Sequence, residues 1–111
     1  MTVDQDSIEA AISVLLKNAP DGSKVILFGS YARDAANPSS DIDFLVVEPH
    51  VADRIREAAR LRIAVHAVLR KFMIPVDILV LSDAEFEQWR HAPNTIYNHA
   101  MREGRVYERV A

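Results

Sequence analysis

Residues 27–47, LFGSYARDAANPSSDIDFLVV, decide the fold of this chain. An apolar run ends at Gly29-Ser30, and ten residues separate Ser30 from Asp41. A second apolar run then begins at Ile42, and Asp41 and Asp43 flank this first residue. Burying a carboxylate is costly unless it is paired or binds a cation. The stretch therefore predicts two strands with a charged site where the second one starts.

The rest of the chain predicts a small α/β domain: a mixed β-sheet flanked by helices. Apolar residues recur every three or four positions in the expected helices, and short continuous apolar runs mark the strands. In the expected helix over 51–72, Ile55 belongs to the apolar side, and Pro93 is expected to open the last helix. The helices are expected over residues 4–18, 30–36, 51–72, 83–91 and 94–103, and the strands over 24–29, 41–48, 75–82 and 105–110.

Composition limits the function classes. The 111 residues carry a net charge of −3 and show no repeat or linker, so 1–111 is interpreted as a single domain that does not bind extended nucleic acid. Nothing resembles a signal peptide or a long apolar span, so no membrane is indicated. The absence of cysteine excludes disulfides and thiolate metal sites and fits a cytoplasmic protein.

Three aspartates form the candidate metal site. Side chains alternate along a strand, so Asp41 and Asp43 are expected on one face, roughly 6 to 7 Å apart. Asp77 begins a later strand with the same alternation. If these strands are neighbours, the three carboxylates converge and repel one another unless cations intervene. Magnesium prefers such oxygen ligands, and a pair of ions about 4 Å apart can promote an in-line displacement.

Gly29-Ser30 forms the candidate phosphate site. Glycine lets the backbone approach phosphate oxygens, and the helix expected from Ser30 would offer free N–H groups. The Ser30 hydroxyl can donate to the same phosphates. Arg33 is either a further phosphate ligand or a structural ion-pair residue.

The pattern Gly29-Ser30, ten residues, Asp41-Ile42-Asp43 and later Asp77 resembles the nucleotidyltransferase fold of the DNA polymerase β superfamily. Within it, the contexts GSYAR and SDIDFLVV resemble the minimal nucleotidyltransferases, including MntA-type antitoxins. The resemblance covers residues 24–82 well, and the C-terminal IYNHAMREGRVYER is similar to the usual ending of the family.

The resemblance implies transfer of a nucleoside monophosphate, with AMP from ATP expected, to an acceptor hydroxyl. Gly29 and Ser30 would then bind the triphosphate, and Asp41 and Asp43 would bind two Mg²⁺ ions. Asp77 would be the third carboxylate and would orient or deprotonate the acceptor.

The resemblance also implies a partner. Larger relatives carry a further domain that is not recognised in this sequence, so a second copy, a partner protein or the acceptor would supply the missing surface. Minimal nucleotidyltransferases are commonly paired with a HEPN-domain toxin, whose tyrosine receives the AMP. Two alternatives stay open: an antitoxin that acts by complex formation alone, and transfer to a small molecule such as an aminoglycoside. Trp89 either packs on the core or anchors a protein interface.

Overall fold

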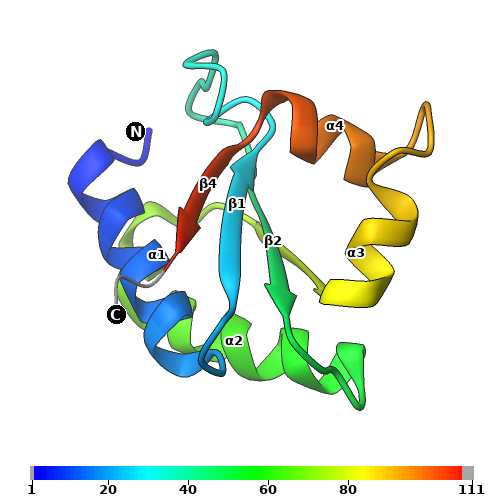
Figure 1. Ribbon diagram of the computed structural model, residues 1–111. Helices are drawn as coiled ribbons and strands as arrows, with labels where there is room; N and C mark the ends of the chain where they lie inside the picture. Colours follow the sequence, from blue (N-terminus) through cyan, green and yellow to red (C-terminus); the bar gives the residue numbers. More distant parts are fainter. Residues whose placement is uncertain (1, 109–111) are drawn as a thin grey trace.

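A computed structural model describes residues 2–108 as a four-stranded mixed sheet with helices on both faces (Figure 1). This arrangement confirms the predicted α/β class. No helix among these residues is both long and apolar enough to cross a membrane. The elements in chain order are α1 (Gln5–Asn18), β1 (Lys24–Phe28), β2 (Ile42–Glu48), α2 (Arg54–Leu69), η1 (Arg70–Phe72), β3 (Val76–Ser82), α3 (Asp83–Trp89), α4 (Ile96–Glu103) and β4 (Arg105–Glu108).

The strand order in the sheet is β3-β2-β1-β4. β1 pairs antiparallel with β2 and with β4, whereas β2 and β3 are parallel. Phe28 of β1 lies opposite Asp43 of β2, and Asp43 lies opposite Asp77 of β3. The end of β1 and the starts of β2 and β3 therefore lie side by side at one end of the sheet.

Side-chain alternation divides the core between the two faces of the sheet. Phe44 and Val46 of β2 pack in the cluster that contains α1 and α2 residues, whereas Leu45 and Val47 pack with Phe86 of α3 on the other face. All four of these β2 side chains are fully buried. The alternation of side chains expected along this strand is confirmed.

Side-chain caps fix where the helices begin. The Asp53 carboxylate accepts a hydrogen bond from the Arg56 backbone N–H at 3.1 Å, so α2 begins at Arg54 and not at residue 51. The Thr95 hydroxyl caps α4 in the same way, because it accepts from the Asn98 N–H at 3.2 Å. The prediction that Pro93 opens this helix was therefore wrong.

The helix predicted over residues 30–36 was wrong as well. Residues 30–34 form hydrogen-bonded turns, closed by the Ala35 N–H donating to the Ser30 carbonyl at 2.9 Å. Asp34 has a φ of +54°, in the left-handed region, where an L-residue cannot continue a right-handed helix. Residues 30–36 therefore offer no helix N-terminus for phosphate binding.

The inward position expected for Ile55 was also wrong. This side chain is 80% exposed, although Leu61 and Val65 of the same helix are fully buried. Ile55 lies in the first turn of α2 and leaves an apolar group at the protein surface. The last expected strand is present as β4 over Arg105–Glu108, and residues 109 and 110 of that prediction lie outside the described part of the chain.

Candidate active site

The central feature of the site is a pair of carboxylates on neighbouring strands. Asp43 lies near the start of β2, and Asp77 lies opposite it near the start of β3. Asp43 is half-buried and Asp77 is exposed. The condition set for the carboxylates to converge, that these two strands are neighbours, is met.

The Asp43 carboxyl has an unusual environment. Burial raises its pKa from 3.8 to about 6, and the Asp77 carboxylate adds to the rise by its negative charge and by accepting a hydrogen bond from protonated Asp43. Asp41 raises the pKa further by its charge, and Arg33 opposes these effects. The site thus holds negative charge that the protein itself does not fully neutralise.

Gly29 makes room for the Asp43 carboxylate. Its φ of +77° is a conformation that glycine adopts without strain, and a Cβ atom at this position would clash with Oδ2 of Asp43. The end of β1 and the first aspartate of β2 can pack this closely only because residue 29 has no side chain. The glycine is therefore part of the carboxylate site as well as of the turn that follows β1.

Ser30 and Arg33 lie in the turn after Gly29. The N–H groups of Ala32 and Arg33 donate to the Gly29 carbonyl at 3.1 and 3.3 Å, which folds the segment back on itself. The Arg33 Nη1 lies 3.2 Å from Oε2 of Glu103 in α4. Arg33 therefore forms a structural ion pair, which was one of the two roles expected for it. Its charge also acts on Asp43, and its role as a phosphate ligand stays a prediction.

Glu103 was not singled out from the sequence. It follows Arg33 by seventy positions and holds it through the ion pair just described. No local pattern signals this contact, because it depends on α4 returning to the turn after β1.

Asp41 lies one residue before β2 and is exposed. Across residues 2–108, no three Asp, Glu, His or Cys side chains come close enough together to hold a metal ion. The structure thus brings Asp43 and Asp77 together and leaves Asp41 beside them, short of the three-carboxylate cluster expected from strand alternation. The donor chemistry still fits a hard divalent cation, because the pair offers oxygen ligands with uncompensated negative charge.

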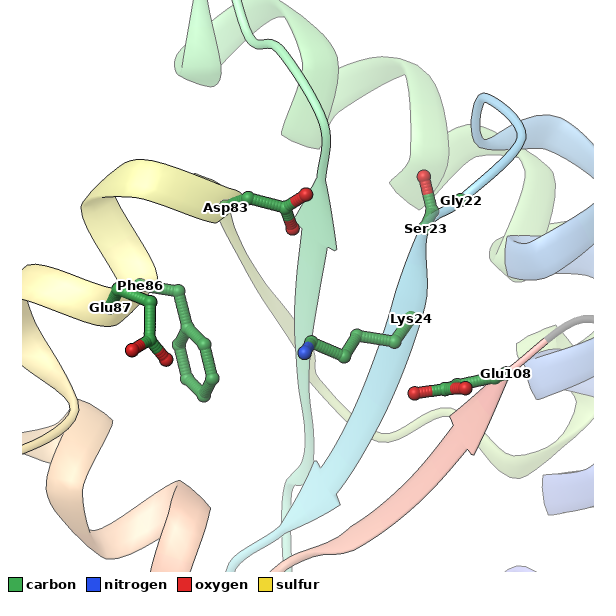
Figure 2. Close-up of a pocket in the computed structure, with 7 residues that line it drawn as sticks. All are labelled: Gly22, Ser23, Lys24, Asp83, Phe86, Glu87 and Glu108. Atoms are coloured by element: carbon green, nitrogen blue, oxygen red, sulfur yellow. The ribbon is translucent and has the colours of Figure 1, made fainter.

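A separate pocket lies at the opposite end of β1. Figure 2 shows it between the start of β1, α3 and β4. Its volume is about 270 Å³. The Lys24 ammonium lies 5.4 Å from the centre of the Phe86 ring, a cation–π contact. The lining residues are Gly22, Ser23, Lys24, Asp83, Phe86, Glu87 and Glu108. None of the site residues predicted from the sequence belongs to this pocket.

Comparison with known proteins supports the same reading of the fold. A solved structure described as "Crystal structure of the toxin-antitoxin with AMP-PNP" is similar with a TM-score of 0.64 and 21% sequence identity, over 96% of this chain and 75% of that chain. No curated protein matches the sequence. The family described as "Nucleotidyltransferase domain" matches residues 8–105. The chain therefore belongs to the nucleotidyltransferase domain family.

Proposed function

We propose that residues 1–111 act as one minimal, magnesium-dependent nucleotidyltransferase domain that transfers AMP from ATP to a hydroxyl of a protein partner. The observation that carries this proposal is the Asp43–Asp77 pair beside Gly29, in a chain that belongs to a nucleotidyltransferase family. The partner proposed is a HEPN-domain toxin in the cytoplasm, and the transfer would make this chain its antitoxin. A similar solved structure is described as a toxin–antitoxin with AMP-PNP, an ATP analogue, which supports both the donor and the partner.

The triphosphate is proposed to bind at the turn after β1. Gly29 allows its backbone to approach the phosphate oxygens, and the Ser30 hydroxyl donates to them. Arg33 adds positive charge close enough to act on the Asp43 carboxylate. This binding mode depends on the turn itself, because no helix begins here.

The transfer is an in-line displacement at the α-phosphorus of ATP. The acceptor hydroxyl oxygen forms a bond to the α-phosphorus, and the bond from that phosphorus to the oxygen bridging to the β-phosphate breaks. Pyrophosphate leaves with the bridging oxygen and its electron pair. Asp77 accepts the proton of the acceptor hydroxyl or orients that hydroxyl, since it is the more exposed carboxylate of the pair.

Asp41, Asp43 and Asp77 are the residues proposed to hold magnesium. When bound, Mg²⁺ supplies charge neutralisation for the triphosphate and for the leaving pyrophosphate. Asp43, close to Gly29 and Asp77, is proposed to be shared between the phosphate and acceptor sides of the site.

The test is incubation of the protein with radiolabelled ATP, CTP, GTP or UTP and magnesium, with and without the product of the neighbouring gene. We expect label on the partner protein with ATP, and none with the Asp43→Asn variant. Asp6→Asn is the matched control, because Asp6 is an exposed aspartate in the first turn of α1. This variant should label the partner as well as the wild type does.

Other outcomes would redirect the proposal. Label on an added aminoglycoside and not on the partner would assign a small-molecule acceptor. A stable complex that forms with no label from any nucleotide, and that still neutralises the toxin when Asp43 is replaced, would assign an antitoxin acting by binding alone.

A further inference from the structure

The free edge of β3 lies in a groove lined by apolar and basic side chains. In the described part of the chain, β3 pairs only with β2, so its other edge has no strand partner. The groove runs along this edge and has a volume of about 260 Å³, with α2 residues on one side and Tyr97 of α4 on the other. Its lining consists of Arg54, Ile55, Ala58, Arg62, Ile78, Leu79, Val80 and Tyr97.

Exposed apolar side chains lie at and beside the groove. Ile55 is 80% exposed at the rim. At the other side Tyr97 contacts Trp89, with ring centres 6.3 Å apart, and Trp89 is 43% exposed. Exposed apolar side chains that gather around one groove are typical of interaction surfaces. An unpaired strand edge beside them is a template for a further strand.

The charge of the groove differs from that of the protein. The chain has a net charge of −3, yet the lining contains two arginines, Arg54 and Arg62, and no acidic residue. Arg54 is held by an ion pair with Glu85, whereas Arg62 is exposed along α2. The positive charge left uncompensated at the groove is that of Arg62, which complements an acidic side chain on an occupant.

The hydrogen-bonding pattern shows which backbone groups are available. The Ile42 N–H donates to the Pro75 carbonyl at 3.2 Å, and Ile42 lies opposite Val76. In a parallel ladder, the odd-numbered residues of β3 therefore bond to β2, and the N–H groups of Ile78 and Val80 point to the free edge.

We propose that this groove binds an extended segment of the protein partner, apolar in its middle and with an acidic side chain opposite Arg62, which adds to the sheet as a strand beside β3. This inference rests on the proposed function, because it places the partner next to Asp77. The Val80 position lies about 10 Å along the strand from Asp77, so a hydroxyl two or three residues beyond the paired segment reaches the carboxylate site.

The first test measures binding of the neighbouring gene's product by calorimetry. Ile55→Glu and Arg62→Glu are expected to weaken binding by more than about tenfold, because they place negative charge in the groove. Ile63→Glu is the matched control, since Ile63 is also on α2, is 75% exposed and does not line the groove. It should change the affinity by less than about twofold.

The second test is amide hydrogen exchange in the complex. The amides of Ile78 and Val80 should gain protection when the partner binds, whereas those of Asp77 and Leu79 should change little because they already bond to β2. Unchanged affinity in Ile55→Glu, unchanged exchange at Ile78 and Val80, or no binding of the partner would each overturn the inference. Self-association of the protein that Ile55→Glu abolishes would also overturn it, because the occupant would then be a second copy.

The groove and the transfer reaction can fail separately. If Asp43→Asn binds the partner through the groove and the wild type transfers no label, the docking surface stands and the proposed activity falls. If the wild type labels the partner while Ile55→Glu binds and labels it unchanged, the activity stands and the docking surface falls.

Discussion

Glu48 gives the sharpest prediction about stability. It ends β2, and its side chain is only 2% exposed. Glu57 of α2 lies beside it and is held by Arg60, whose Nε and Nη2 donate at 2.8 and 2.7 Å. Arg60 also donates to the Asn18 carbonyl at 2.8 Å. The cluster therefore ties the end of α1 to α2, with Glu48 buried beneath it. The pocket lined by Glu48, Glu57 and Arg60 is also lined by His50, Asp53 and Arg56.

Burial and the adjacent Glu57 raise the pKa of Glu48 from 4.5 to about 8, whereas the hydrogen bond from Arg60 lowers the pKa of Glu57 to about 2. Between pH 4.5 and 8 the folded protein keeps a proton on Glu48 that the unfolded chain releases. The free energy of unfolding therefore falls as pH rises, by about 1.4 kcal/mol per pH unit. Glu57 has the opposite sign, because its contribution rises with pH, and that rise is complete above pH 4.5.

The perturbation is Glu48→Gln. Glutamine has the same shape, has no proton to lose, and can donate its amide hydrogen to Glu57 as protonated Glu48 does. We expect the variant to match the wild type near pH 5 and to be more stable at pH 8 by roughly 4 kcal/mol, which is three pH units at the slope above. That difference is a large part of the total stability of a domain of this size.

The assay is urea unfolding at pH 5, 6, 7 and 8, followed by circular dichroism, with the free energy extrapolated to water. Glu9→Gln is the control, because Glu9 is exposed on α1 and should leave the pH profile unchanged. The reasoning is refuted if the wild type and Glu48→Gln lose stability in parallel from pH 5 to 8. It is refuted equally if the wild type shows no loss over this range.

Three further substitutions follow from the geometry. Gly29→Ala should destabilise the protein by about 1 to 2 kcal/mol in urea unfolding and abolish AMP transfer, because its Cβ meets Asp43 and its φ is positive; normal labelling would contradict this. Ser82→Ala removes the capping box of α3 and should lower stability by about 1 kcal/mol in thermal unfolding, with no effect on labelling. Tyr31→Phe should cost about 1 to 3 kcal/mol, because the buried Val3 N–H donates to the Tyr31 hydroxyl at 3.1 Å; an unchanged midpoint would show that Val3 finds another acceptor.

The strands were predictable because their information is local. Alternation along residues 42–47 separates two buried faces, and the structure packs them in two separate clusters. The same alternation places Asp43 on the face of β2 that also carries Leu45 and Val47. The register that sets Asp43 opposite Asp77 could not be read from the sequence, since it depends on how β2 and β3 align.

The turn after β1 differs from the helix predicted over residues 30–36 for a physical reason. Residues 30–36, SYARDAA, are rich in alanine, and alanine favours helix. A left-handed Asp34 ends the segment after one turn, and Tyr31 is drawn into the core beside α1. Tertiary packing thus overrides local propensity here, and the sequence carries no strong sign of it.

Strand order gives the two carboxylates different surroundings. β2 is an inner strand, so Asp43 is half-buried between β1 and β3 and lies against Gly29. β3 is an edge strand, so Asp77 is exposed and the same strand presents its free edge to the groove. An acceptor carried by a protein must approach from outside the sheet, and the edge strand is where it can do so without displacing another element. The position of β3 therefore agrees with the role proposed for Asp77, as the carboxylate that meets the acceptor.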